Sequence, residues 1–191
     1  RGMPFRSVSR SEVDYTRFGV LVRFLEKEQP QFLINAAGST GKPNVDACEY
    51  ERSDTLLGNV VLPVVVSHAC QVAGIPWGQV SSGCIYSGAW IRQQGAARIE
   101  PDLMRANVKT LVETEPDCVQ GFAESDTPNF SFRHMPCGFY SGSKALAEEV
   151  LQREDSNSYI WRLRIPFDEQ DHSRNYLSKL LNYKRLYENF N

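Results

Sequence analysis

The sequence lacks the marks of several classes of protein. In its 191 residues we find no signal peptide and no apolar run that approaches the length of a membrane span. The formal net charge is -2, which does not favour binding to nucleic acid or to an acidic membrane. The five cysteines are an odd number and lack the spacing of a metal site. We therefore expect a cytoplasmic protein with reduced thiols, no metal, no nucleic-acid partner and no membrane partner.

The pattern of apolar residues predicts an α/β fold. Strand-like runs begin at four positions: Phe5, Gln31, Trp77 and Ser158. Helical spacing predicts helices over four ranges and a fifth that begins at Tyr140: 17–29, 54–73, 101–114 and 174–188. Pro63 should kink the second helix or mark its true start. Such alternation favours a doubly wound parallel sheet with helices on both faces.

The chain divides into a large unit and a short tail. Residues 1–170 contain the predicted sheet, and residues 171–191 begin a substrate-binding region. Inside the large unit, residues from about 88 to 120 show no strand signal and are predicted to be an insertion. The insertion is interpreted as a lid over the site or a flap that binds a partner, with core packing by its apolar helix as an equal alternative.

A Tyr and a Lys four residues apart carry the candidate chemistry. Tyr140 and Lys144 share one face of the predicted helix. A tyrosine hydroxyl has a pKa near ~10, and a neighbouring ammonium group should lower it. The pair could then move a proton to or from an alcohol or carbonyl oxygen. By spacing alone, an ordinary helix start is the competing interpretation.

Two predicted strand ends favour the chemical interpretation. Residues 77–86 are predicted to be a strand that runs into a turn, and Ser82 could donate a hydrogen bond to the oxygen that Tyr140 protonates. Residues two apart along a strand face the same way, so Cys84 would share the face of Ser82. Small residues at a strand end let a flat ligand approach the backbone. The run from Gln31 ends in such a series: Asn35, Ala36, Ala37 and Gly38.

These motifs resemble the extended short-chain dehydrogenase/reductase family. Asn-Ala-Ala-Gly at 35–38, Ser-x-x-x-Tyr at 82–86 and Tyr-x-x-x-Lys at 140–144 follow the family's order and spacing. The resemblance implies a Rossmann-like fold that binds NADP(H), with NAD(H) as the alternative. It implies cofactor contacts from the following residues: Ser9, Arg10, Asp14, Asn35, Ala36, Ala37, Gly38, Asn59, Tyr140, Lys144 and Pro166. Arg10 would suit the 2′-phosphate of NADP(H), although a solvated surface arginine is the plainer interpretation.

The family's first strand and its Gly-x-x-Gly-x-x-Gly turn are absent, as is most of the C-terminal substrate domain. We expect these parts of the protein to lie outside this sequence.

Further segments are similar to bifunctional 3,5-epimerase/4-reductases that make rhamnose nucleotides. The matching segments are residues 44–49, 83–85, 124–130, 139–144 and 174–179. The similarity implies that Cys84 and Lys179 exchange protons at the sugar ring, while Ser82, Tyr140 and Lys144 serve reduction at C4. It implies substrate contacts from four residues: Thr40, Asn129, Arg174 and Asn175. Without the similarity, Lys179 would be interpreted as a solvated lysine.

The predicted function is 3,5-epimerisation and NADPH-dependent C4 reduction of an NDP-4-keto-6-deoxyhexose. A silent NADP-binding regulatory subunit, a plain 4-reductase and a pure 3,5-epimerase are the alternatives. Cys84 and Lys179 favour the enzyme, because a binding module needs no proton-transfer pair. The identities of the nucleotide and the sugar are left open, as is assembly into a homodimer.

Overall fold

Three parallel strands form the central sheet of the protein, which is described by a computed structural model over residues 4–154, 158–165, 167, 169–171 and 175–188. The sheet has the order β1-β2-β6 and joins β1 (Leu33–Asn35), β2 (Trp77–Ser82) and β6 (Ser158–Leu163). Trp77 of β2 lies opposite Leu33 on one side and Ser158 on the other. The predicted α/β class with a parallel sheet is confirmed, and three of the four predicted strand runs are neighbours in it.

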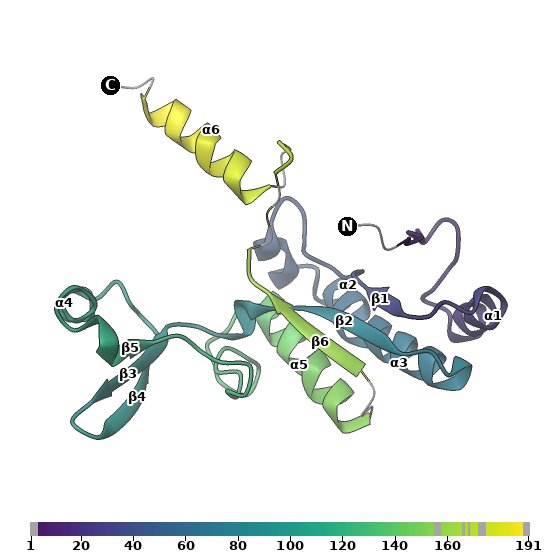
Figure 1. The fold of residues 1–191 in the computed structure, drawn as a ribbon, viewed down its shortest axis with the longest axis horizontal. Helices are drawn as coiled ribbons and strands as arrows, with labels where there is room; N and C mark the ends of the chain where they lie inside the picture. Colours follow the sequence, from purple (N-terminus) through teal and green to yellow (C-terminus); the bar gives the residue numbers. More distant parts are fainter. Residues whose placement is uncertain (1–3, 155–157, 166, 168, 172–174, 189–191) are drawn as a thin grey trace.

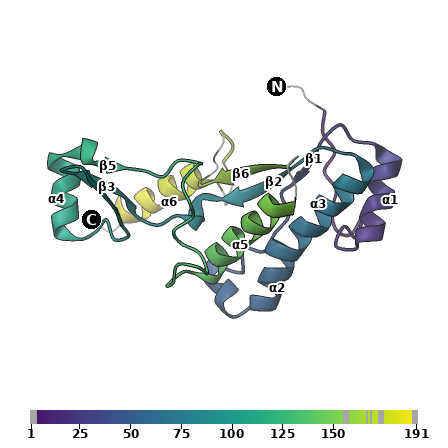
Figure 2. The ribbon, with the colours of Figure 1, turned by 90° about the horizontal axis from the view of Figure 1, so that it is seen from below.

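The helices of both crossovers cover the same face of this sheet (Figures 1 and 2). They are α2 (Arg52–Leu56) and α3 (Leu62–Ala73) between β1 and β2, and α5 (Phe139–Glu154) before β6. A π-helical turn, Leu57–Val61, joins α2 to α3, and Pro63 lies in the first turn of α3. Proline has no backbone N–H to donate to a preceding turn, so its place after an irregular turn is physically reasonable. Of the two roles predicted for Pro63, the structure shows an irregular turn directly before it, inside a helical stretch that already begins at Arg52.

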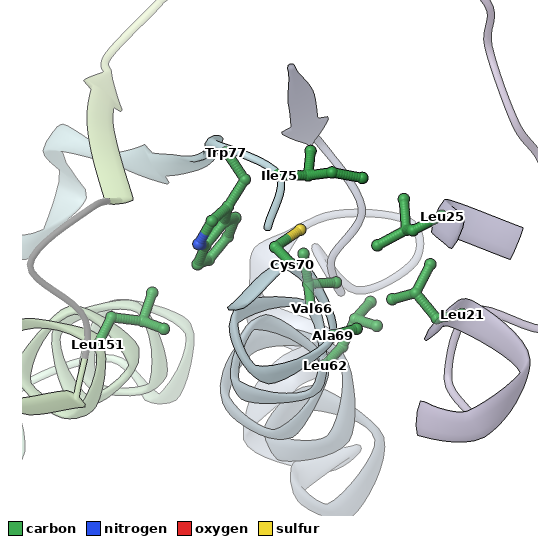
Figure 3. Packing of buried hydrophobic residues seen from close by; sticks show 9 residues of the cluster. All are labelled: Leu21, Leu25, Leu62, Val66, Ala69, Cys70, Ile75, Trp77 and Leu151. Carbon is green, nitrogen blue, oxygen red and sulfur yellow. The ribbon is translucent and has the colours of Figure 1, made fainter. Parts of the chain in front are cut away.

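The main core lies between α1 (Phe18–Glu28), α3 and the start of β2. Figure 3 shows that these elements, with α5, point nine buried side chains toward one another: Leu21, Leu25, Leu62, Val66, Ala69, Cys70, Ile75, Trp77 and Leu151. Leu21 and Leu25 are four residues apart and therefore share one face of α1. Burial of each large apolar side chain contributes roughly 1.5–3 kcal/mol, so this cluster holds the helices against the sheet.

The stretch from α2 to α3 corrects one expectation. Arg52–Ala73 is a helix of 22 residues that could, by length and composition alone, cross a membrane. A core helix can pass the same test, and Val66, Ala69 and Cys70 of this stretch are buried in the main core. The sequence therefore does contain a run of spanning length, but its partners here are α1, β2 and α5.

The insertion contains strands that the sequence pattern did not indicate. β3 (Ala89–Gln93), β4 (Ala96–Glu100) and β5 (Val119–Gln120) form an antiparallel sheet of order β4-β3-β5, and α4 (Ala106–Thr114) lies between β4 and β5 in the chain. The turn between β3 and β4 has positive φ at both Gln94 (50°) and Gly95 (79°). Such a turn suits a hairpin, but Gln-Gly is a weaker signal than Asn-Gly, which explains the wrong prediction. Figure 1 shows this subdomain projecting away from the parallel sheet.

The first residues of the described chain differ from expectation, whereas the helix expected at the other end is present. Residues 4–9 form no strand, Phe5 is 90% exposed, and the backbone N–H groups of Glu12 and Val13 close a turn on the Ser9 carbonyl. The predicted strand from Phe5 is therefore wrong, and the Ser9 carbonyl bonds to the turn that follows it. At the other end, α6 (Tyr176–Glu188) extends away from the sheet (Figure 1).

The sheet is covered by helices on one face only within the described ranges, where two faces were predicted (Figures 1 and 2). Apolar side chains stand partly exposed along its strands or next to them: Phe32, Ile34, Tyr159, Trp161 and Leu163. The rings of Phe32, Tyr159 and Trp161 contact one another.

Candidate active site

The candidate site lies where β1 and β2 end and α5 begins. Tyr140 is in the first turn of α5, and Lys144 follows one turn later. The Lys144 Nζ lies 5.9 Å from the centre of the Tyr140 ring, and Lys144 is 7% exposed. Two residues four apart on a helix are neighbours, so the helix itself produces this pairing. The structure thus brings the two residues of the predicted Tyr–Lys pair together.

Burial dominates the acid–base properties of the pair. Burial raises the pKa of Tyr140, a hydrogen bond with Ser82 lowers it, and the nearby thiols of Cys84 and Cys48 raise it further. Burial lowers the pKa of Lys144, and the carboxylate of Glu148 partly opposes this shift. The pKa of Tyr140 is thus shifted in the direction opposite to the one expected from a neighbouring ammonium group, because desolvation of the phenolate is the larger effect.

A network centred on Asn59 holds the end of β1 against α5. The Asn59 Oδ1 accepts from the Ser39 N–H at 2.8 Å, and its Nδ2 donates to the Ser39 carbonyl at 2.9 Å. The same Nδ2 donates to the Ser143 Oγ at 3.1 Å, and Ser143 donates to the Tyr140 carbonyl at 2.7 Å. Asn59 lies in the π-helical turn, a feature that often occurs at functional sites.

The end of β1 fits the approach of a flat cofactor. A Cβ placed on Gly38 would lie 2.9 Å from the Asn59 Oδ1 and 3.3 Å from the Lys144 Nζ, so a side chain there would fill the space beside the lysine. The Asn35 Oδ1 accepts from the Ala37 N–H at 3.1 Å, and its Nδ2 donates to the Gln79 Oε1 at 2.7 Å. Asn35 therefore shapes the turn that presents Ala36 and Ala37.

Cys84 reaches the site through a turn and not along a strand. β2 ends at Ser82, whose Oγ accepts from the Cys84 N–H at 3.1 Å and caps the 3-10 turn Gly83–Ile85. The expectation that Ser82 and Cys84 share one face of a strand is therefore wrong, because Cys84 lies in the turn after the strand. Both residues still lie near Tyr140. Cys84 lines a pocket of about 460 Å³ together with Ser141, the residue after Tyr140.

None of the predicted substrate residues that the structure describes lines this pocket. The Asn129 side chain is bonded to the backbone of Ser87 on both its oxygen (3.0 Å) and its nitrogen (2.9 Å). Thr40 is exposed, and the Asn175 Oδ1 caps α6 by accepting from the Leu177 N–H at 3.0 Å. Lys179 is exposed on α6. Arg174 and Pro166 lie outside the described residues.

The predicted adenosine-side residues form a local cluster. Arg10 pairs with Asp14 at 3.7 Å, and the Asp14 Oδ1 accepts from the Thr16 hydroxyl at 2.5 Å. The Ser9 and Ser11 hydroxyls are 2.8 Å apart. The hydrogen bond from Thr16 lowers the pKa of Asp14. The side chain of Arg10 is 70% exposed and is therefore accessible to an anion.

A buried ion pair behind the site was missed from the sequence. Glu148 accepts a hydrogen bond from Ser81 of β2 and pairs with Arg162 of β6 at 2.8 Å. Arg162 also donates to the Tyr86 hydroxyl and to the Glu124 carbonyl, each at 2.7 Å. Glu148 follows Lys144 by four residues, which was the available signal. Glu49 was missed as well, and its carboxylate accepts from the Phe139 N–H at the start of α5 at 2.6 Å. In the described ranges, no group of three His, Cys, Asp or Glu side chains could hold a metal ion.

This arrangement defines an α/β protein of the short-chain dehydrogenase/reductase type, with a Tyr–Lys pair at the carboxyl ends of parallel strands. The chain belongs to the family whose model is described as the RmlD substrate binding domain, and that model matches residues 1–190. The family consists of NAD(P)-dependent nucleotide-sugar reductases like dTDP-4-dehydrorhamnose reductase. The family relationship predicted from the motifs is confirmed.

Two similar proteins come from Arabidopsis thaliana. The bifunctional dTDP-4-dehydrorhamnose 3,5-epimerase/dTDP-4-dehydrorhamnose reductase is 29% identical over 167 residues, which are 87% of this chain and 46% of that protein. A trifunctional UDP-glucose 4,6-dehydratase/UDP-4-keto-6-deoxy-D-glucose 3,5-epimerase/UDP-4-keto-L-rhamnose-reductase is 28% identical over 167 residues, 87% of this chain and 21% of that protein. The chain therefore spans less than half the length of these relatives.

Solved structures share the fold. A UDP-rhamnose synthase from Acanthamoeba polyphaga mimivirus matches 93% of this chain and 52% of its own, with a TM-score of 0.65 and 21% identity. A dTDP-4-dehydrorhamnose reductase from Bacillus anthracis, in complex with NADP, matches 93% of this chain and 50% of its own, with a TM-score of 0.58 and 14% identity. At these identities the likeness concerns the fold alone.

Proposed function

We propose that the protein epimerises C3 and/or C5 of an NDP-4-keto-6-deoxyhexose and reduces C4. The observation that carries the proposal is the meeting of Ser82, Cys84 and Tyr140, because it combines a carbonyl-protonating group with a second acid–base group. The Arabidopsis relatives support it, because both are named for 3,5-epimerase and reductase activities.

Each residue has a defined task in this proposal. The C4 ketone acidifies the protons at C3 and C5, so Cys84 as thiolate can take a ring proton while Lys179 supplies one to the opposite face. Reduction then follows, and a bound nicotinamide would supply the hydride to C4. As the hydride adds, Tyr140 gives its hydroxyl proton to the C4 oxygen, and Ser82 holds that oxygen by a hydrogen bond. Lys144 stabilises the resulting phenolate and would hold the ribose of the cofactor.

Heavy water separates the two chemistries. The full-length protein is incubated with NADPH and UDP- or dTDP-4-keto-6-deoxyglucose, and the products are analysed by mass spectrometry and NMR. The wild type should place deuterium at C3 and/or C5, whereas Cys84→Ala should lose this exchange and still reduce the unepimerised ketone. Tyr140→Phe should lower the reduction rate by about 10²–10⁴-fold. Cys118→Ala, in the insertion, is the matched control and should behave as wild type.

Deuterium incorporation by Cys84→Ala at the wild-type rate would contradict the epimerase role. The protein would then be a plain 4-reductase, the second candidate, which is favoured by the exposed position of Lys179 on α6. Exchange without reduction would indicate a pure 3,5-epimerase. A wild type that neither exchanges nor reduces either sugar would favour a silent regulatory subunit.

We propose NADPH as the preferred cofactor, because the exposed guanidinium of Arg10 could bind a 2′-phosphate. Arg10→Ala should weaken NADPH binding about tenfold or more and leave NADH binding nearly unchanged, as measured by calorimetry. Arg23→Ala, another exposed arginine, serves as the control. Equal losses for both cofactors would remove the proposed 2′-phosphate contact. A cytoplasmic location, a homodimer and the division at residue 170 stay predictions.

A further inference from the structure

The pocket beside Cys84 contains a cationic group with no part in the proposed chemistry. Ser141, next to Tyr140, lines this pocket of about 460 Å³, as do Gly121 and Phe122 at the base of the insertion. Arg164 also lines it and is the one side chain with a permanent charge among the described lining residues. A single charge in an otherwise neutral pocket is well suited to orient a charged ligand.

The structure holds Arg164 in place from two directions. It follows Leu163, the last residue of β6, so the sheet determines where its side chain begins. Its guanidinium donates to the Gly83 carbonyl at 3.0 Å, and a Cβ on Gly83 would lie 3.3 Å from the Arg164 Cδ. The side chain therefore packs across Gly83, directly before Cys84. The Gly83 contact uses one of the five N–H donors that a guanidinium carries.

We propose that Arg164 binds the diphosphate of the nucleotide sugar and thereby positions the sugar ring beside Cys84. This inference rests on the proposed function and identifies a binding residue within it. A 4-keto-6-deoxyhexose has no charge, so the phosphates are the groups of the substrate that an arginine would recognise. The planar guanidinium can donate two parallel hydrogen bonds to phosphate oxygens, which gives direction as well as attraction.

Two aromatic residues of the pocket lining agree with a neutral sugar lying past this cation. Phe122 stacks on Tyr86 with ring centres 4.8 Å apart and planes 9° from parallel. Tyr86 is itself held by Arg162 and by the Asp126 carbonyl, each at 2.7 Å. This rigid aromatic wall offers contact area without charge, so electrostatic attraction within the pocket is concentrated at Arg164.

Binding and turnover of the full-length protein test the proposal. The affinities for UDP and dTDP are measured by calorimetry, and KM and kcat are measured with the 4-keto sugar nucleotide that the wild type accepts. Arg164→Gln should weaken diphosphate binding and raise KM by about 10- to 100-fold, because a charge-assisted contact is lost. The change in kcat should be small, since the diphosphate is bound equally in the ground state and the transition state. Arg92→Ala, an exposed arginine of the insertion, should leave all of these values unchanged.

The choice of variants keeps the test decisive. Glutamine can still donate to the Gly83 carbonyl, so Arg164→Gln preserves the local fold better than alanine, and Arg164→Lys should restore part of the affinity. Wild-type affinity for UDP and dTDP in Arg164→Gln would overturn the diphosphate contact and leave the proposed function intact. A fall in kcat at unchanged KM would also overturn it, by placing Arg164 in the chemical step. If the wild type itself neither binds a nucleoside diphosphate nor converts a sugar, the proposed function fails together with the inference.

Discussion

Tyr140 and Lys144 are both placed where burial opposes their charged forms. Burial raises the pKa of the tyrosine and lowers that of the lysine, so the fold favours the neutral form of each. For proton transfer this is useful at Tyr140, because a protonated hydroxyl is the form that can donate to a carbonyl oxygen. For Lys144 the same burial has a cost in stability that depends on pH.

The stability of the fold should therefore rise with pH through the titration of Lys144. The pKa of buried Lys144 lies below its usual value of 10.5, so between the two values the unfolded chain holds a proton that the folded protein has released. The wild type should gain free energy of unfolding relative to Lys144→Met as pH rises toward 10.5, and the gain should level off above it. The pKa of Tyr140 is raised above its usual value of 10.0, which has the opposite effect on stability at high pH. Because Tyr140 is present in both proteins, its contribution largely cancels in the difference between them.

Urea denaturation at several pH values between about 7 and 10 measures this difference. Lys27→Met is the matched control, because the Lys27 side chain is 82% exposed and its removal should have no such pH dependence. A difference between wild type and Lys144→Met that stays constant or falls with rising pH would contradict the argument.

At the scale of elements, the insertion is joined to the catalytic region through Gly88. Gly88 has a φ of +78°, and a Cβ there would lie 1.8 Å from the Glu100 carbonyl oxygen. Gly95, in the β3–β4 turn, has a φ of +79°, and no atom lies within 4 Å of its added Cβ. The two glycines thus share a backbone conformation and differ in the space around them.

This pair of glycines separates backbone strain from steric overlap. Gly95→Ala should destabilise the protein by about 1–2 kcal/mol through its left-handed conformation alone. Gly88→Ala should cost clearly more, because the backbone of β4 must also move, and hydrogen exchange should become faster in β3 and β4. Urea denaturation and exchange measured by mass spectrometry compare the two. Equal effects of the two substitutions would show that the close approach of Gly88 to Glu100 does not constrain the insertion.

At the scale of the whole molecule, one ion pair ties the sheet to the site. Glu148 of α5 and Arg162 of β6 have side chains that are 3% and 15% exposed, and Ser81 and Tyr86 bond to the same pair. Removing one partner of such a pair leaves an uncompensated charge in a poorly solvated place. The pair therefore couples the sheet, α5 and the segment that leads from the insertion back to the site.

Two neighbouring glutamates of α5 test this coupling. Glu148→Ala should lower the free energy of unfolding by about 3–5 kcal/mol, the usual cost of breaking a buried ion pair. Glu149→Ala should cost at most about 1 kcal/mol, because Glu149 pairs with Arg133 and Arg153 at the surface. Urea denaturation of both variants gives the comparison. A loss for Glu148→Ala as small as that for Glu149→Ala would mean that the pair does not hold the elements together.

Local patterns in the sequence were sufficient for several features of this protein. The spacing of Tyr140 and Lys144 determined their pairing, since one turn of any helix brings such residues together. The run from Trp77 was enough to predict β2, although not that the strand ends at Ser82. Pro63 likewise indicated an irregularity near its own position in the helix, because its missing N–H acts within that helix.

Tertiary structure alone decided the features that depend on residues far apart in the chain. Cys84 reaches the site through a turn, Glu148 meets Arg162 across the second crossover, and Arg164 packs on Gly83. The pKa of Tyr140 rises where its lysine neighbour alone would lower it, because burial is produced by the whole fold. Such contacts and such burial form only when segments separated by tens of residues pack together. The local periodicity of the sequence does not predict which side chains this packing brings into contact.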